Sequence, residues 1–285
     1  MFFVFFSKAL KSHTILFVLV IGLFVCCKKK IEDPSVPDLS SVKELSIAEA
    51  DLNSIFLDVD SIVASNSVSF GKLFKKDTLI NSYNKFIELT YQTADKLSTT
   101  RTGNVKCFFK GSKKVGDYQD SVLFENTRIN GRLITGYFST NQKHDLFNLN
   151  TWLFEFNSSG YAENSKGDKI KFKTDFATKI KIGNVTGDTV KGKKGDFWYS
   201  SGSWLGTDSQ GQLFSVKTAS TSPPLNASSL VIKATCSNHY PVQGVQDFFN
   251  ASQSINYRVN FGGGACDSYA SYLNEKGLEY IFFIE

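Results

Sequence analysis

From about residue 79 onward, apolar and polar side chains alternate with a period of two, which restricts much of this chain to β-strands. The alternation is clear in Lys169–Lys173, in Lys179–Ile182 and in Tyr257–Phe261. Because successive side chains of a strand point to opposite faces, each segment predicts a strand with one apolar and one polar face. The lysines on the polar faces also discourage edge-to-edge aggregation.

Turn signals separate the strand-like segments. Asn130-Gly131 lies between Ser121–Ile129 and Arg132–Phe138 and predicts a two-residue type I′ hairpin. A second pattern places Asn or Asp three residues before Gly, which is typical of a type I turn followed by a left-handed residue. It occurs at Asn157–Gly160, Asn164–Gly167, Asp208–Gly211 and Asn274–Gly277.

The short spacing between turns decides the strand direction. Parallel pairing needs long crossover connections, and this chain has none, so the strands are expected to pair antiparallel. The sequence therefore predicts a mainly β fold over residues 67–285. An antiparallel meander would form either a curled single sheet or a two-layer sandwich.

One segment, residues 43–66, has a different period. Its apolar residues recur at spacings of three and four, which predicts one amphipathic helix of about 20 residues. Ser40 or Ser41 is expected to cap this helix, and Asp58 and Asp60 are expected on its solvated face. The apolar positions are Leu45, Ala48, Leu52, Phe56, Val59 and Val63.

Residues 1–26 have the features of an export signal. Lys8 and Lys11 precede an apolar run, Ile15–Val25, of about eleven residues, which matches the 7–15 residues of a signal peptide and falls short of the ~20 that a membrane-spanning helix needs. The run ends at Cys26-Cys27, as in a bacterial lipobox, where a cysteine becomes the first mature residue and carries the acyl chains, palmitate among them. An ordinary cleaved signal peptide or an uncleaved anchor is the alternative.

The residue before the acylated cysteine must be small to fit the peptidase. Cys26 meets this requirement for Cys27, whereas Val25 does not meet it for Cys26, so Cys27 is the predicted lipidation site. Cys26 remains the alternative because Leu23 lies at the preferred position three residues upstream. Residues 27–42 hold two of the five prolines and no apolar period, so they predict a flexible tether.

Several segments together resemble a group of uncharacterised lipoproteins from Bacteroidota-type bacteria. The resemblance covers the lipobox and roughly residues 80–285. Its features are turn glycines and one cysteine pair, so it concerns the fold and not an activity. The residues that carry it are Thr102–Lys106, Phe124–Gly131, Thr135-Gly136, Pro224-Leu225, Cys236 with Pro241 and Gly244, and Phe261–Asp267. The group often has a further cysteine after the first of these strands, where this chain has only Tyr91–Asp95.

The resemblance implies a location and a modification. The protein would be lipid-anchored in the cell envelope, at the outer membrane. Bacteria of that phylum also O-glycosylate exported proteins at Asp-Ser or Asp-Thr followed by an apolar residue. The matching positions are Ser61, Thr78, Ser121 and Thr189.

Three cysteines lie beyond the lipobox. An exported protein meets an oxidising compartment. Cys236 ends one strand-like run and Cys266 follows the next clear strand, so these two are predicted to form a disulfide. Cys107, within Val105–Phe109, is predicted to be a buried apolar residue.

No catalytic or metal-binding signature is present, and no cofactor is expected. The residues singled out for binding are Trp198, Tyr199 and Trp204, which would form a platform for sugar rings or a protein partner if exposed, and core if buried. The net charge of +5 is too small and too dispersed for nucleic-acid binding. The expected partners are the membrane, through the lipid anchor, and a glycan or envelope protein.

These observations favour a non-catalytic binding or structural module. The alternative is a hydrolase acting on envelope or extracellular polysaccharide. A cleft with two facing carboxylates about 5–10 Å apart would favour the hydrolase.

Overall fold

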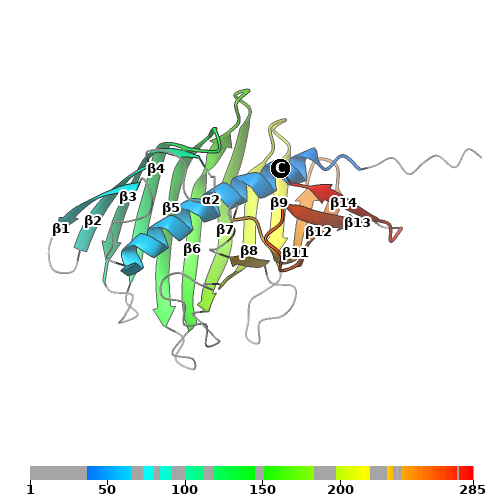
Figure 1. Cartoon of the computed structure of the whole chain (residues 1–285). Helices are drawn as coiled ribbons and strands as arrows, with labels where there is room; N and C mark the ends of the chain where they lie inside the picture. The colour runs from blue at the N-terminus through cyan, green and yellow to red at the C-terminus, as the bar shows by residue number, and fades with distance from the viewer. Residues whose placement is uncertain are drawn as a thin grey trace, which may run out of the picture. The chain divides into compact units, whose positions relative to one another are not determined.

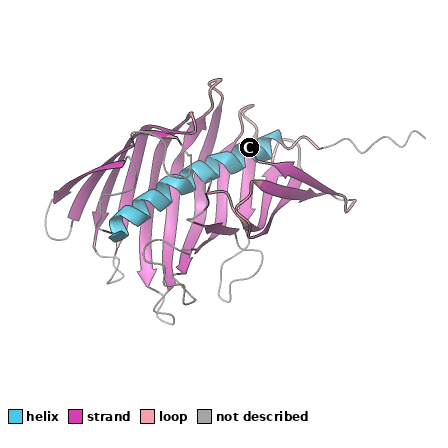
Figure 2. Cartoon of the chain, in the orientation of Figure 1, coloured by secondary structure: helices cyan, strands magenta, loops and turns pink. Residues whose placement is uncertain are grey.

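The structure is a computed structural model that contains one helix and one large antiparallel sheet (Figures 1 and 2). It describes residues 37–65, 73–79, 84–91, 100–111, 118–144, 151–182, 197–218, 230–233, 236, 239–274 and 276–284. The helix is α2 (Ser40–Ser65). The strands are β1 (Leu73–Leu79), β2 (Asn84–Tyr91), β3 (Arg101–Lys110), β4 (Gln119–Ile129), β5 (Arg132–His144), β6 (Thr151–Glu163), β7 (Lys169–Ile182), β8 (Phe197–Thr207), β9 (Leu213–Thr218), β10 (Leu230–Lys233), β11 (Gln243–Asn250), β12 (Ile255–Gly263), β13 (Tyr269–Leu273) and β14 (Glu279–Phe283).

Each strand pairs mainly with its neighbours in sequence. The order runs from β1 to β8 without interruption and continues through β10, β11, β12, β13 and β14, while β9 pairs with β8 and β11. All pairs are antiparallel, which confirms the predicted meander. The fold is a curled single sheet and not a sandwich, and Figure 1 shows the sheet bending around α2.

The helix lies in the concave face of the sheet, and its burial extends beyond its apolar stripe. Leu45 and Ile55 are fully buried in the core, as the helical period predicts. Asp51 and Asn53 are buried as well, because the curled sheet covers the sides of the helix in addition to one face. Residues 39–285 accordingly form one compact unit that includes both the helix and the strands.

The prediction of a solvated acidic face on the helix is wrong. Asp60 is buried. Asp58 accepts hydrogen bonds from the Tyr91 hydroxyl at 2.7 Å and from the Arg101 guanidinium at 3.3 Å. The acids of α2 therefore face polar partners on the inner side of the sheet.

The predicted hairpin turns are largely confirmed. Asn130 and Gly131 have φ values of 49° and 81°, as a type I′ turn requires. In three of the four Asn/Asp–Gly motifs the glycine amide donates a hydrogen bond to the carbonyl oxygen of the first residue, and the glycine has positive φ. These three are Asn164–Gly167, Asp208–Gly211 and Asn274–Gly277.

The fourth motif, Asn157–Gly160, lies within β6 and not in a turn, so that prediction is wrong. Gly160 pairs directly with Gly136 of β5. A Cβ atom on Gly160 would stand 2.3 Å from the carbonyl oxygen of Thr135. The glycine is therefore present because two strands approach closely, which leaves no room for a side chain.

The predicted cysteine chemistry is confirmed for all three described cysteines. Cys236 and Cys266 form a disulfide with a Cα–Cα distance of 5.3 Å, 30 residues apart in sequence. Cys236 also packs with Val231 and Val242 in a small cluster beside Tyr199. Cys107 is fully buried in the main core.

The predicted signal peptide, the lipidation site at Cys27 and most of the tether lie outside the described residues. Within the described residues, no helix combines the length and apolar character that a bilayer crossing demands.

Candidate functional site

A bulge in β7 creates the most unusual site in the structure. The two alternating segments of the sequence, Lys169–Lys173 and Lys179–Ile182, belong to this one strand. Against β8 the register shifts between Thr174 and Phe176, so β7 contains one extra residue there. A one-residue slip exchanges the two faces of a strand. The inward positions are therefore even-numbered before the bulge, as in Ile170 and Phe172, and odd-numbered after it, as in Lys179.

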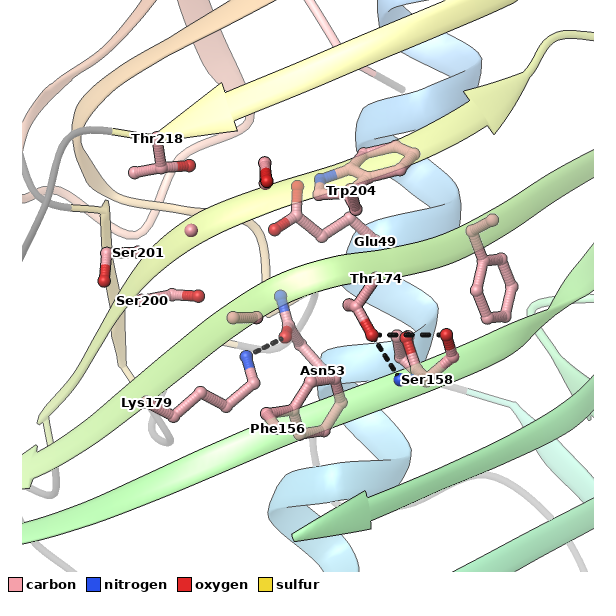
Figure 3. A pocket seen from close by; sticks show the side chains of 15 residues that line it. Glu49, Asn53, Phe156, Ser158, Thr174, Lys179, Ser200, Ser201, Trp204 and Thr218 are labelled. Carbon is pink, nitrogen blue, oxygen red and sulfur yellow. Dashed lines mark hydrogen bonds between the residues drawn. The ribbon is translucent and has the colours of Figure 1, made fainter.

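Lys179 consequently points into the core, and its predicted place on the polar face is wrong. Its side chain is only 3% exposed. Its Nζ atom donates a hydrogen bond to Oδ1 of Asn53 in α2 at 2.8 Å (Figure 3). The ammonium also stands 5.2 Å from the ring centre of Phe56 and 4.9 Å from that of Phe156. Burial lowers the pKa of Lys179 to about 8, and the Glu49 carboxylate only partly opposes this change.

Glu49 is the acidic member of the site. It lies one helical turn before Asn53, beside the Trp204 ring (Figure 3). Its carboxylate accepts a hydrogen bond from Nε2 of Gln246 at 3.0 Å. Burial raises the pKa of Glu49, while Gln246, Lys179 and Trp204 act in the opposite direction. The site therefore brings a carboxyl and an amine together, each in surroundings that disfavour its charged form.

A cavity of about 40 Å³ lies between α2 and the strands β6 to β9. Since one water molecule needs about 10–15 Å³ of such space, the cavity has room for two or three waters and not for a sugar ring. Among the described residues, Nδ2 of Asn53 and Oγ of Ser158 are buried without a hydrogen-bond partner. Water in the cavity would satisfy both atoms. The polar residues of its lining include Glu49, Asn53, Ser158, Thr174, Lys179, Ser200, Ser201 and Thr218.

The chemistry available in this cavity is limited. Glu49 is the only carboxylate among the described residues that line it. The facing pair of carboxylates expected of a glycoside hydrolase is therefore missing from the lining. The same described residues suit bound water.

Two arginines on the sheet hold the middle of α2. The carboxylate of Asp51 accepts hydrogen bonds from Nε and Nη2 of Arg132 at 2.8 and 2.7 Å. Burial nevertheless raises the pKa of Asp51, because desolvation outweighs the effect of Arg132. Arg101 donates to Oγ of Ser54 at 2.6 Å and pairs with Asp58 at 3.2 Å.

The start of α2 is held by the turn between β8 and β9. The Glu44 carboxylate accepts hydrogen bonds from the backbone amide and the hydroxyl of Ser209, at 3.0 and 2.8 Å. The Ser41 hydroxyl, predicted as a possible helix cap, donates to Oδ2 of Asp208 at 2.7 Å. Polar contacts therefore attach the helix to the sheet along most of its length.

The proposed aromatic platform is not an exposed surface. Trp198 is 1% exposed and packs against Phe56 and Phe154 at ring-centre distances of 4.8 and 5.3 Å. Trp204 is 9% exposed and lines the cavity. Both indoles point inward because they occupy even-numbered positions of β8, the face covered by α2. Tyr199 points the other way and is half-buried.

The candidate glycosylation sites differ in their surroundings. Thr78 on β1 and Ser121 on β4 are exposed. Ser61 belongs to α2, with its side chain outside the described residues, and Thr189 lies outside them altogether. Over the described ranges, no group of three or more His, Cys, Asp or Glu side chains is arranged to hold a metal ion.

Glu49, Asn53 and Lys179 are site residues that no sequence motif identifies. The first two belong to a polar stripe on α2 that also contains Ser46 and Asp60, at helical spacings. A second stripe of polar residues beside the apolar one indicates a helix that is covered on more than one side. That signal was available from the sequence.

No protein-family model, curated protein or solved structure matches this chain. The resemblance to Bacteroidota-type lipoproteins stays a prediction.

Proposed function

We propose that this protein is a lipid-anchored component of a bacterial cell envelope and that its folded part is a non-catalytic binding or structural module. Residues 1–26 would be removed as a signal peptide, and Cys27 would carry the acyl chains. Several acyl chains on one cysteine hold a protein to a membrane far more firmly than a single chain does.

The observation that carries this proposal is the Cys236–Cys266 disulfide, in a chain that also has Cys26-Cys27 directly after an apolar run. Disulfides form and persist in oxidising compartments such as the periplasm and the cell surface. The bridge therefore supports export by a criterion independent of the signal sequence.

The attachment of α2 supports a structural or binding role for the folded part. The tether leads directly into this helix, and buried or partly buried polar contacts fix the helix at Glu44, Asp51, Asn53 and Asp58. Tension on the anchor would thus pass into the middle of the sheet and not into a terminal strand. The lone carboxylate in the cavity lining gives the polysaccharide hydrolase no comparable support.

Metabolic labelling with palmitate tests the anchor. The full chain should incorporate label and fractionate with membranes, and Cys27→Ser should abolish both. Cys26→Ser is the matched control and should keep the label, because serine is also small enough for the position before the cleavage site. Label that survives Cys27→Ser but is lost in Cys26→Ser would move the lipidation site to Cys26. An unlabelled chain that still fractionates with membranes would overturn the proposal.

Polysaccharide digestion tests the non-catalytic role. The purified protein should release no reducing sugar from envelope or extracellular polysaccharide. Release that disappears in Glu49→Gln, while Glu125→Gln on the exposed side of β4 keeps it, would establish the hydrolase instead.

A further inference from the structure

The C-terminal hairpin, β13 and β14, presents an apolar surface to solvent. Its exposed side chains include the most exposed large apolar residue in the described structure, Ile281, at 74%. Contiguous exposed apolar surface of this kind marks a site of interaction. We call this surface the hairpin face, and its apolar residues are Tyr269, Leu273, Ile281 and Phe283. Ser271 and Glu279 lie on the same side, paired with Ile281 and Leu273.

The strand register explains why these residues are together. Tyr269 pairs with Phe283 across the hairpin, and their ring centres are 4.9 Å apart. Ile281 is the next residue of β14 on the same side, since side chains alternate along a strand. The intervening residues Ala270 and Phe282 point inward and are buried in the core. The hairpin is thus stabilised by its inner face, and the outer apolar face contributes nothing to the core.

The hairpin face lies near the point where the tether enters the folded unit. The Nζ atom of Lys43, in the first turn of α2, stands 5.8 Å from the ring centre of Phe282. Leu39, at the start of this unit, follows Cys27 by twelve positions. At about 3.3–3.6 Å per residue the chain between them spans at most about 43 Å. A lipid on Cys27 would therefore keep the hairpin within reach of the bilayer surface.

We infer that the hairpin face rests on the bilayer to which the protein is anchored, so that the partner of this surface is lipid. This inference relies on the proposed acylation of Cys27. Aromatic residues such as Tyr269 and Phe283, together with aliphatic ones, suit the boundary between headgroups and acyl chains. Lys276 and Glu279 are both exposed in this hairpin, so the contact relies on the apolar side chains and not on charge.

The backbone limits how deeply the hairpin enters. Within the described sheet, β14 pairs only with β13, so its other edge presents unpaired backbone groups. Such groups cannot enter the hydrocarbon region without a large cost in free energy. The hairpin face therefore lies in the headgroup region, with only its side chains reaching the acyl chains.

A second exposed apolar group provides a matched control. Phe108, Leu123 and Tyr137 are exposed on strands β3 to β5. Two of these strands, β3 and β5, contact the middle of α2, through Arg101 and Arg132. Tyr137 is thus a comparable exposed residue on strands that do not pair with the hairpin.

The test uses the full acylated protein in vesicles of phosphatidylethanolamine and phosphatidylglycerol. Ile281→Cys and Tyr137→Cys are each labelled with the polarity-sensitive dye NBD. The unsubstituted protein is treated with the same dye, and its fluorescence gives the background from the native cysteines. The fluorescence of the dye at position 281 should increase several-fold and its emission should shift to shorter wavelength. The dye at position 137 should keep the weak, long-wavelength emission of a dye in water. Adding Tyr269→Glu and Phe283→Glu to Ile281→Cys should return the dye to water.

The possible results separate the two proposals. An aqueous signal at position 281 in palmitate-labelled protein would overturn membrane docking and leave the anchor intact. Absence of palmitate would overturn the anchor, whatever the dye reports. A dye shift that grows with the protein-to-lipid ratio would overturn lipid as the partner and identify a second copy of the chain.

Discussion

Arg132 and Asp51 are 81 residues apart in sequence and share two parallel hydrogen bonds, at 2.8 and 2.7 Å, that join β5 to α2. The carboxylate is 3% exposed and the guanidinium side chain 23% exposed. Loss of Arg132 would therefore leave a buried carboxylate without these two hydrogen bonds, whereas loss of Asp51 would leave a guanidinium that still reaches solvent.

Arg132→Met should lower the free energy of unfolding by about 3 kcal/mol at neutral pH, because it leaves a buried carboxylate unpaired. The same change at Arg258, which is 64% exposed in its pair with Asp247, should cost less than about 1 kcal/mol. Urea denaturation of both variants measures the difference. Adding Asp51→Leu to Arg132→Met should recover much of the loss, and equal losses at Arg132 and Arg258 would contradict the structure.

The buried lysine predicts a specific pH dependence of stability. The pKa of Lys179 is about 8 in the folded protein, below the usual 10.5 of an unfolded chain. Between these values the unfolded state binds more protons, so the free energy of unfolding should rise with pH, by up to about 1.4 kcal/mol per unit. Below about pH 8 both states are protonated and the contribution is constant.

Denaturation between about pH 8 and pH 10, compared with that of Lys179→Met, isolates this contribution because other titrating groups cancel. The rise should vanish in Lys179→Met and persist in Lys171→Met, whose side chain is exposed on the same strand. Parallel stability curves for the wild type and Lys179→Met would show that the amine is not buried.

The close approach of β5 and β6 predicts an intolerant glycine. Gly160→Ala places a methyl group 2.3 Å from the Thr135 carbonyl oxygen and should cost about 1–3 kcal/mol or more, with a clear fall in melting temperature. Gly263→Ala meets no atom within 4 Å and should be nearly neutral. Similar melting temperatures for the two variants would exclude the close strand contact.

The disulfide should stabilise the fold against unfolding. Closing a loop over a separation of 30 residues contributes about 3–4 kcal/mol in the chain-entropy description. A reductant should therefore lower the melting temperature of the wild type and leave the double variant Cys236→Ser/Cys266→Ser unchanged. Sensitivity of the double variant to the reductant would place the effect elsewhere.

The elements that depend on local sequence could be predicted. The period of α2, the Asn130-Gly131 turn and the alternation of β12 all arise from residues a few positions apart. Antiparallel pairing followed from the absence of long connections. The choice between a curled sheet and a sandwich could not be made, because it depends on where the helix packs.

The cavity could not be predicted, because it depends on the register between neighbouring strands. The bulge in β7 is defined only by comparison with β6 and β8, and it alone turns Lys179 inward. The burial of Trp198 and Trp204 likewise depends on which face of β8 the helix covers. A motif such as Asn157–Gly160 fits both a turn and a close strand contact, and only the pairing of Gly160 with Gly136 decides between them.

The hydrogen bond between Glu49 and Gln246 joins residues 197 positions apart. During synthesis the helix leaves the ribosome first, whereas this partner becomes available only near the end of the chain. Contacts over such long separations slow folding. Glu49 therefore stays without this native partner until nearly all of the sheet has been synthesised, and the last strands to be made complete the surroundings of a carboxylate in one of the first elements.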